Sequence, residues 1–146
     1  MANVEIQPAS IMYLDACKKL LESVDLPIDG LEDQFENFLL LLRDGDLIGL
    51  IGLETHKSSG LLRSLAVKPV FQGNGLGILL TDAILEKAKE MMLKEVYLLT
   101  ETAENFFIKR GFSRINRELA PETIKSSKEF AHVCPVSASL MKIALV

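Results

Sequence analysis

The sequence predicts a mixed α/β domain, in which helices cover both faces of a mostly antiparallel sheet with one parallel strand pair. Two observations predict this class. Residues 38–54 carry two apolar runs around "RDGD", and Asp44-Gly45 is a strong hairpin signal. Residues 61–100 follow a strand–helix–strand pattern, which makes a right-handed crossover between parallel strands. A chain of 146 residues fits one domain, residues 1–146.

The N-terminal part begins with a strand and a helix. Residues 4–9 alternate briefly between apolar and polar side chains, as a strand does. Ser10 is suited to cap a helix from Ile11 to about Ser23, because its hydroxyl can accept from a free backbone N–H. A proline and a glycine then interrupt the regular structure, and the sequence of residues 31–37 indicates a short helical turn.

The remaining elements follow from the same signals. In the central part of the chain, the hydrophobic pattern predicts strands at 38–42, 47–54 and 61–67. It also predicts a helix from about Leu76 to Met91 and a strand at 95–100. The last part predicts a short helix at 103–111, a strand at 112–115, a helix at 121–130 and a final strand at 137–146.

Composition narrows the function classes. A net charge of −4 and a pI near 5.2 argue against non-specific binding of nucleic acid. No apolar run reaches the roughly 18 residues of a membrane span, and Glu5 and Gln7 stand where a signal peptide would be apolar. The two cysteines, Cys17 and Cys134, lack a metal-binding spacing. We therefore expect a cytoplasmic protein with no disulfide, no metal site and no membrane partner.

Three glycines at alternate positions precede the central helix. Gly73, Gly75 and Gly77 lie in "VFQGNGLGILLTDAILEKAKE", residues 70–90. A helix N-terminus presents free N–H groups and the positive end of a dipole, and glycine lets an anion approach them. This pattern favours a phosphate cradle over a merely tight turn. A Walker loop is excluded because no Lys-Ser or Lys-Thr follows, and a G-x-G-x-x-G fingerprint fails at Ile78 and Leu80.

The loop resembles the signature of one enzyme family. "QGNGLG" (72–77) matches the Q/R-x-x-G-x-G/A motif of the GCN5-related N-acetyltransferases, with Gln72, Gly75 and Gly77 at its defined positions. "FFIKRGF" (106–112) is similar to the family's F-Y-x-x-x-G-F. The resemblance covers most of the chain and is specific through residues 61–112.

The resemblance implies a binding site for acetyl-CoA as co-substrate. In this family the fourth and fifth strands splay apart and admit the cofactor. By resemblance, the backbone of Leu65, Ala66 and Val67 would bind the pantetheine arm, and Asn105 and Phe107 would line the CoA side of the next helix. The backbone amides of the loop would hold the pyrophosphate; these belong to Gln72, Gly73, Asn74, Gly75, Leu76, Gly77 and Ile78.

A narrower resemblance points to the acceptor. "LLRSLAV", "LLTETAENFFIKRGF" and "APETIKSSKEFAHVCPVSASLM" are similar to acetyltransferases of arsenic-resistance operons and to the acetyltransferase domain of N-acetylglutamate synthases. This implies acetylation of the amine of a small carboxylate-bearing molecule, an amino acid or an amino-acid-like toxin. The alternatives are a protein or peptide N-acetyltransferase and a non-catalytic CoA-binding module. Many relatives are dimers, so the final strand is expected to pair across a homodimer.

Arg63 is the leading substrate-binding candidate. It is predicted to share a strand face with Leu61, Leu65 and Val67, where a buried charge needs a partner. One interpretation is a structural ion pair with Glu54. The other is an anchor for a substrate carboxylate, since Arg binds carboxylates bidentately. Glu54 itself is either a general base or a solvated strand end.

The remaining chemistry stays open. Thr100 and Glu101 end a strand at the predicted splay and are expected to touch substrate. Phe107 stands where many relatives have a tyrosine that acts as general acid, so either another group protonates the leaving thiolate or the thiolate leaves unprotonated. The candidates for that role are a water molecule, Tyr97, Cys134 and Ser137.

Overall fold

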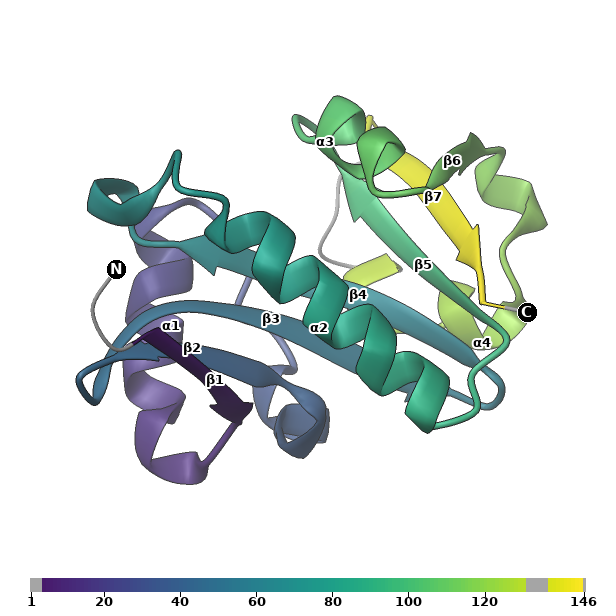
Figure 1. Ribbon diagram of the computed structural model, residues 1–146. Helices are drawn as coiled ribbons and strands as arrows, with labels where there is room; N and C mark the ends of the chain where they lie inside the picture. Colours follow the sequence, from purple (N-terminus) through teal and green to yellow (C-terminus); the bar gives the residue numbers. More distant parts are fainter. Residues whose placement is uncertain (1–3, 131–136, 146) are drawn as a thin grey trace.

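The computed structural model describes residues 4–130 and 137–145, which form one seven-stranded sheet (Figure 1). Its strand order is β1-β2-β3-β4-β5-β7-β6, and every neighbouring pair is antiparallel except β4 and β5. The strands are β1 (Val4–Pro8), β2 (Leu39–Arg43), β3 (Asp46–His56), β4 (Ser59–Val67), β5 (Glu95–Thr100), β6 (Ser113–Ile115) and β7 (Ser139–Ala144).

Helices cover both faces of the sheet. In Figure 1, α2 crosses in front of the central strands, and α1 lies behind β1–β4. The α-helices are α1 (Leu14–Ser23), α2 (Leu76–Glu90), α3 (Glu104–Lys109) and α4 (Glu122–Lys125). The 3₁₀ segments are η1 (Ile11–Tyr13), η2 (Leu31–Asn37), η3 (Pro69–Phe71) and η4 (Arg117–Leu119). This arrangement confirms the predicted fold class.

Of the three apolar clusters among the described residues, the two larger lie on opposite faces of the sheet. In β2, alternate residues point to opposite faces, so Leu39 and Leu41 pack toward α2 while Leu40 and Leu42 pack toward α1. Leu80, Ile84 and Ala88 of α2 complete the first core, and α1 and η2 complete the second. Because both faces are covered, the central strands are almost continuously apolar, which explains why "FLLLL" shows no alternation.

β4 and β5 separate soon after they start. They pair only over Ser59–Leu61 and Glu95–Tyr97. Beyond these residues the two strands diverge, and we call the space between them the splay. No other strand of the described residues fills it, since β5 continues with β7 as its next neighbour.

A bulge in β4 corrects one sequence prediction. The register with β3 shifts between the pairs Gly52↔Arg63 and Leu50↔Ala66, and Ser64 takes a left-handed conformation with φ 63°. Leu65 and Val67 therefore pack toward α2, whereas Arg63 lies on the opposite face. The prediction that Arg63 shares a face with Leu65 and Val67 is wrong. It rests on strict alternation of side chains along the strand, and the extra residue at the bulge breaks this alternation.

The end of the chain differs from the predicted final strand and helix. β7 has β5 on one side and β6 on the other, so its edges are occupied within the chain. The expected pairing of this strand across a dimer is therefore wrong for β7. The helix predicted at 121–130 is interrupted: α4 covers Glu122–Lys125, a turn and a bend follow at 126–127, and helical backbone resumes at 128–130.

Candidate functional site

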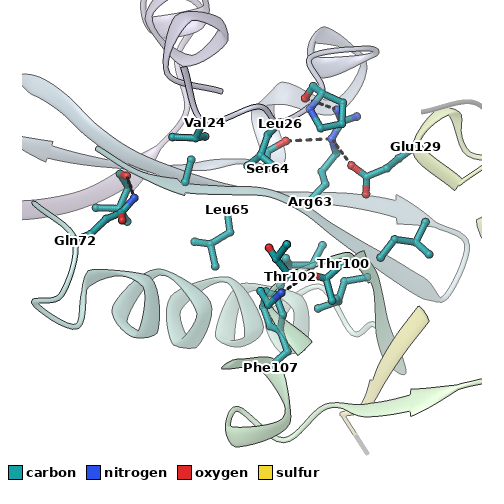
Figure 2. A pocket seen from close by; sticks show the side chains of 17 residues that line it. Val24, Leu26, Arg63, Ser64, Leu65, Gln72, Thr100, Thr102, Phe107 and Glu129 are labelled. Atoms are coloured by element: carbon teal, nitrogen blue, oxygen red, sulfur yellow. Dashed lines mark hydrogen bonds and ion pairs between the residues drawn. The ribbon is translucent and has the colours of Figure 1, made fainter. Parts of the chain in front are cut away.

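A cavity of about 310 Å³ occupies the splay. Figure 2 shows Leu65 of β4 and Thr100 of β5 on opposite sides of it, with Arg63 and Glu129 close together at one end and Gln72 at the other. Val24, Leu26 and Pro27, which follow α1, close it from the other face of the sheet. The cavity is thus largely apolar with a charged end, the usual make-up of a small-molecule site.

A wider groove of about 720 Å³ continues from this cavity along the glycine loop. The two spaces share Gln72, Thr102, Ala103 and the backbone stretch Leu65–Val67 as lining residues. The groove adds Phe71, the loop glycines, Ile78 and Phe106. An elongated ligand could therefore lie along the loop and insert one end between β4 and β5.

The glycine loop leaves the start of α2 open. Gly73 (φ 84°) and Gly75 (φ 79°) adopt left-handed conformations, and a Cβ on either would meet no atom within 4 Å. Conformation rather than crowding therefore requires these glycines. The Gln72 side chain donates to the Val67 carbonyl at 2.9 Å and ties the loop to β4. The first turn of α2 carries no acidic residue, so its N–H groups and dipole favour an anion.

Arg63 is at the centre of a buried ionic cluster. Its side chain is 0% exposed, and Nη1 donates to a Glu54 carboxylate oxygen at 2.9 Å. Its Nε lies 3.2 Å from Ser64 Oγ and 3.5 Å from a Glu129 oxygen (Figure 2). The ion pair with Glu54 that one interpretation expected is therefore present. Arg63 also lines the cavity, so the contacts are compatible with a second role toward ligand.

Glu54 is held as a carboxylate. One oxygen accepts from Arg63, and the other lies 3.0 Å from His56 Nε2. Burial raises the pKa of Glu54, but the hydrogen bonds and charges of His56 and Arg63 outweigh it and bring the pKa below its ordinary value. A carboxylate with both oxygens engaged and a lowered pKa is a weak base, which argues for a structural role.

Glu129 has the opposite electrostatics. It is 5% exposed, lines the cavity, and has one charged partner within the described part of the chain, Arg63, at 3.5 Å. Burial raises the pKa of Glu129 to about 7, against the charge of Arg63 and with the help of the Glu54 charge. Glu129 could not be predicted from the sequence, because "KEF" near a helix end resembles an ordinary surface segment and no local pattern marks a buried acid.

The other predicted residues divide between the cavity and the surface. Thr100 and Phe107 line the cavity. Glu101 is exposed and accepts from Ser137 Oγ at 3.2 Å. Asn105 is exposed on α3 and lines neither space, whereas its neighbour Phe106 lines the groove. Asn74 turns its side chain back to the Phe71 carbonyl at 3.2 Å.

Two of the candidate general acids, Tyr97 and Ser137, do not line the cavity. Tyr97 is buried below Leu61 and Leu140, lines neither space, and its hydroxyl lies 3.5 Å from Glu95. Ser137 is exposed at the surface. Cys134 lies outside the described residues, while Cys17 is buried among α1 residues with its pKa raised by burial to about 12.

The described residues contain neither a cluster of metal ligands nor a membrane-spanning helix. In 4–130 and 137–145, no three His, Cys, Asp or Glu side chains gather in a way that would hold a metal ion. Within the same residues, no helix has the length and apolarity needed to cross a membrane.

Comparison with known proteins agrees with this geometry. The family model described as "Acetyltransferase (GNAT) domain" matches residues 34–114. An amino-acid acetyltransferase of Photobacterium profundum is 29% identical over 70% of this chain and 24% of its own length. One of Neisseria meningitidis is 32% identical over 64% of this chain and 22% of its own length. The chain therefore spans about a quarter of the length of these relatives.

Solved structures repeat the pattern. N-acetylglutamate synthase from Neisseria gonorrhoeae, complexed with coenzyme A and L-arginine, matches 99% of this chain and 34% of its own, with 25% identity and a TM-score of 0.83. The protein Rv2747 from Mycobacterium tuberculosis, in complex with CoA and NLQ, covers 97% of this chain and 99% of its own. Its 23% identity and TM-score of 0.82 establish a common fold.

Proposed function

The chain belongs to the GNAT acetyltransferase family, and from this premise we propose that it transfers the acetyl group of acetyl-CoA to the amine of a small carboxylate-bearing molecule such as an amino acid. The observation that carries the proposal is the cavity in the splay, which opens into the glycine-loop groove at one end and meets the buried Arg63 at the other. These two ends suit a phosphate-bearing cofactor and a carboxylate.

The cofactor would lie along the loop. Amides from Gln72 to Ile78 would hold the pyrophosphate, with the α2 dipole adding to their attraction. The backbone of Leu65, Ala66 and Val67 would hydrogen-bond the pantetheine arm, as a neighbouring strand would. Phe107, at the floor of the cavity, would pack against the thioester end. Asn74 and Asn105 would contribute only from the surface, since neither lines the two spaces.

The acceptor would enter at the Arg63 end. Nη2 of Arg63 has one long contact, 3.5 Å to the Pro27 carbonyl, so part of the guanidinium remains for a substrate carboxylate. Thr100 lies on the β5 side of the cavity and would contact the substrate. Glu101 would reach it only from the exposed rim. The same relatives support this choice, since their names specify amino-acid acetylation.

In the proposed reaction the site would position the thioester and the amine, without a tyrosine as general acid at position 107. An amide N–H of β4 near Leu65 or Val67 would polarise the thioester carbonyl. Because Phe107 has no hydroxyl, the thiolate would leave as the anion or take its proton from water.

We further propose a cytoplasmic location, no nucleic-acid or membrane partner, a single domain over residues 1–146, and a homodimer that does not use β7.

The test combines binding with turnover. Calorimetry with CoA comes first, followed by acetyl-CoA-dependent thiol release against a panel of free amino acids and their phosphonate and arsenic-containing analogues. Arg63→Lys keeps the charge beside Glu54 but removes the planar fork, so we expect KM for the amino acid to rise about tenfold or more while CoA affinity is unchanged.

Arg114→Lys is the matched control, because Arg114 is exposed on the edge strand β6. An unchanged KM in Arg63→Lys would show that Arg63 is only structural. CoA binding without turnover of any free amine would favour the peptide-acetylating or the non-catalytic alternative.

A further inference from the structure

Glu129 is the one carboxylate among the described residues that line the cavity. We propose that it is the general base that accepts the proton of the acceptor's ammonium group. The proposal rests on the proposed function and names a residue for a step which that function leaves unassigned.

Contacts of Lys128 hold the segment after α4 in a position from which Glu129 can contact an acceptor substrate in the cavity. Lys128 Nζ bonds Asp33 of η2 at 2.9 Å, and Lys128 Cδ lies over Gly30, within 2.9 Å of where a Cβ there would sit. The next residue, Glu129, then points inward over β4 and reaches Arg63 Nε at 3.5 Å (Figure 2). The carboxylate is therefore at the Arg63 end of the cavity, opposite the end that opens to the glycine loop.

Arg63 and Glu129 together match a zwitterion. An amino acid carries a carboxylate and an ammonium on one carbon, so the two groups would need a cation and an anion side by side. The pair at 3.5 Å offers this arrangement, and both partners line the same cavity. A substrate carboxylate on Arg63 thus brings its ammonium next to Glu129.

The electrostatics suit a base. Among the described residues, Arg63 of β4 and Glu54 of β3 are the charged groups that act on Glu129, and the neighbouring Lys128 is turned outward to Asp33. Burial holds the pKa of Glu129 near 7, so it can take up and release a proton at neutral pH. Glu54 cannot substitute, since both of its oxygens are engaged and it does not line the cavity.

The step balances with the groups named. The ammonium N–H gives its proton to the Glu129 carboxylate and leaves a neutral amine with a free electron pair. That pair attacks the thioester carbon, an N–C bond forms, and the carbonyl pair moves to oxygen. When the carbonyl reforms, the C–S bond breaks and its pair leaves with sulfur. The nitrogen loses its surplus proton to the thiolate or water, and Glu129 returns its proton to solvent.

The experiment uses the full chain, acetyl-CoA and the amino acid with the highest turnover in the panel. Glu129→Gln keeps shape and polarity without basicity, and we expect kcat to fall by about 100-fold or more at pH 7.5. Because the variant needs an amine that is already neutral, its remaining activity should rise about tenfold per pH unit up to the amine's own pKa. The wild type should instead level off above pH 7.

Two further variants separate chemistry from folding. Glu129→Asp keeps a carboxylate, so it should retain the wild-type pH limb at reduced kcat. Glu122→Gln, on exposed α4, should match the wild type throughout. CoA affinity, measured by calorimetry, should be the same in all four proteins.

The outcomes distinguish this inference from the proposed function. A Glu129→Gln variant with wild-type kcat and an unaltered pH profile would overturn the base while the acetyltransferase stands. A uniform loss of activity with no change in the profile would make Glu129 structural. If the wild type turns over no free amine, the proposed function fails first and this inference fails with it.

Discussion

At the scale of single residues, the ionic cluster around Arg63 contains two carboxylates with opposite pKa shifts, of which only Glu129 lines the cavity. Arg63 lies between Glu54, whose pKa is lowered, and Glu129, whose pKa is raised. The difference follows from contacts, because Glu54 has two close partners, whereas Glu129 has a single charged one, at 3.5 Å, among the described residues. His56 and Arg63 together lower the pKa of Glu54, while burial outweighs the charge of Arg63 and raises the pKa of Glu129.

This asymmetry makes a stability prediction for the ligand-free protein. The pKa of Glu129 is about 7 in the folded protein and 4.5 as the ordinary value that applies to the unfolded chain. As pH rises, the unfolded chain therefore loses this proton at a lower pH than the folded protein does. Stability from Glu129 is therefore complete below about pH 4.5 and lost as pH rises through 7. Relative to wild type, Glu129→Gln should gain up to about 3 kcal/mol in free energy of unfolding between pH 4.5 and 8.

Urea unfolding of both proteins across that pH range measures the gain. The lowered pKa of Glu54 is common to both, so the difference isolates Glu129. A difference that stays constant with pH would mean that the pKa of Glu129 is ordinary.

Sequence could predict some of these residues and not others. That the glycine loop and the stretch Leu65–Val67 line adjoining spaces was predictable, because a local motif marks the loop and the strand before it. The ion pair of Arg63 with Glu54 was predictable as one of two alternatives, since adjacent strands bring them together. Glu129 was not, because its burial depends on the segment after α4 folding over β4, far along the chain.

At the scale of elements, the bulge in β4 decides which face each residue takes. The hairpin, the crossover and the central helix follow from local signals, and their observed bounds differ little from those expected. The bulge has no such signal, because "LLRSLAV" looks like an uninterrupted strand. Only the pairing with β3 shows that there is an extra residue, and the left-handed φ places it at Ser64.

The bulge can be tested through Ser64. Its φ of 63° strains a β-branched residue most, so Ser64→Val should lower the free energy of unfolding by about 2 kcal/mol or more. Ser64→Gly relieves the strain but loses the contact with Arg63 Nε, so its effect should stay within about 1 kcal/mol. Chemical denaturation measures both.

Ser139→Val is the control, because Ser139 lies in the regular strand β7, where valine is well suited. Equal losses for valine at Ser64 and Ser139 would contradict a strained bulge at Ser64.

At the scale of the whole molecule, the sheet consists of two parts joined by few strand contacts. β1–β4 form one part and β5, β7 and β6 the other, and they meet through three residue pairs of β4 and β5 (Figure 1). A ligand in the splay would contact both parts, so binding should stabilise the joint as well as the site.

CoA at 100 times its Kd should raise the free energy of unfolding by about 2.7 kcal/mol, which is roughly 5–10 °C in Tm for a chain of this size. Hydrogen exchange should slow at both 65–67 and 98–100 and change little in β1. Slowing confined to one part would mean that the ligand does not bridge the splay.

The splay also creates a strand edge in the interior of a sheet. Beyond Leu61, the side of β4 that faces β5 has no neighbouring strand among the described residues. Such edges invite pairing with another polypeptide, and proteins discourage it with bulges and inward-pointing charges. Ser64 and Arg63 supply both along this stretch. The features that shape the ligand site therefore also protect the empty protein from aggregation through its open edge.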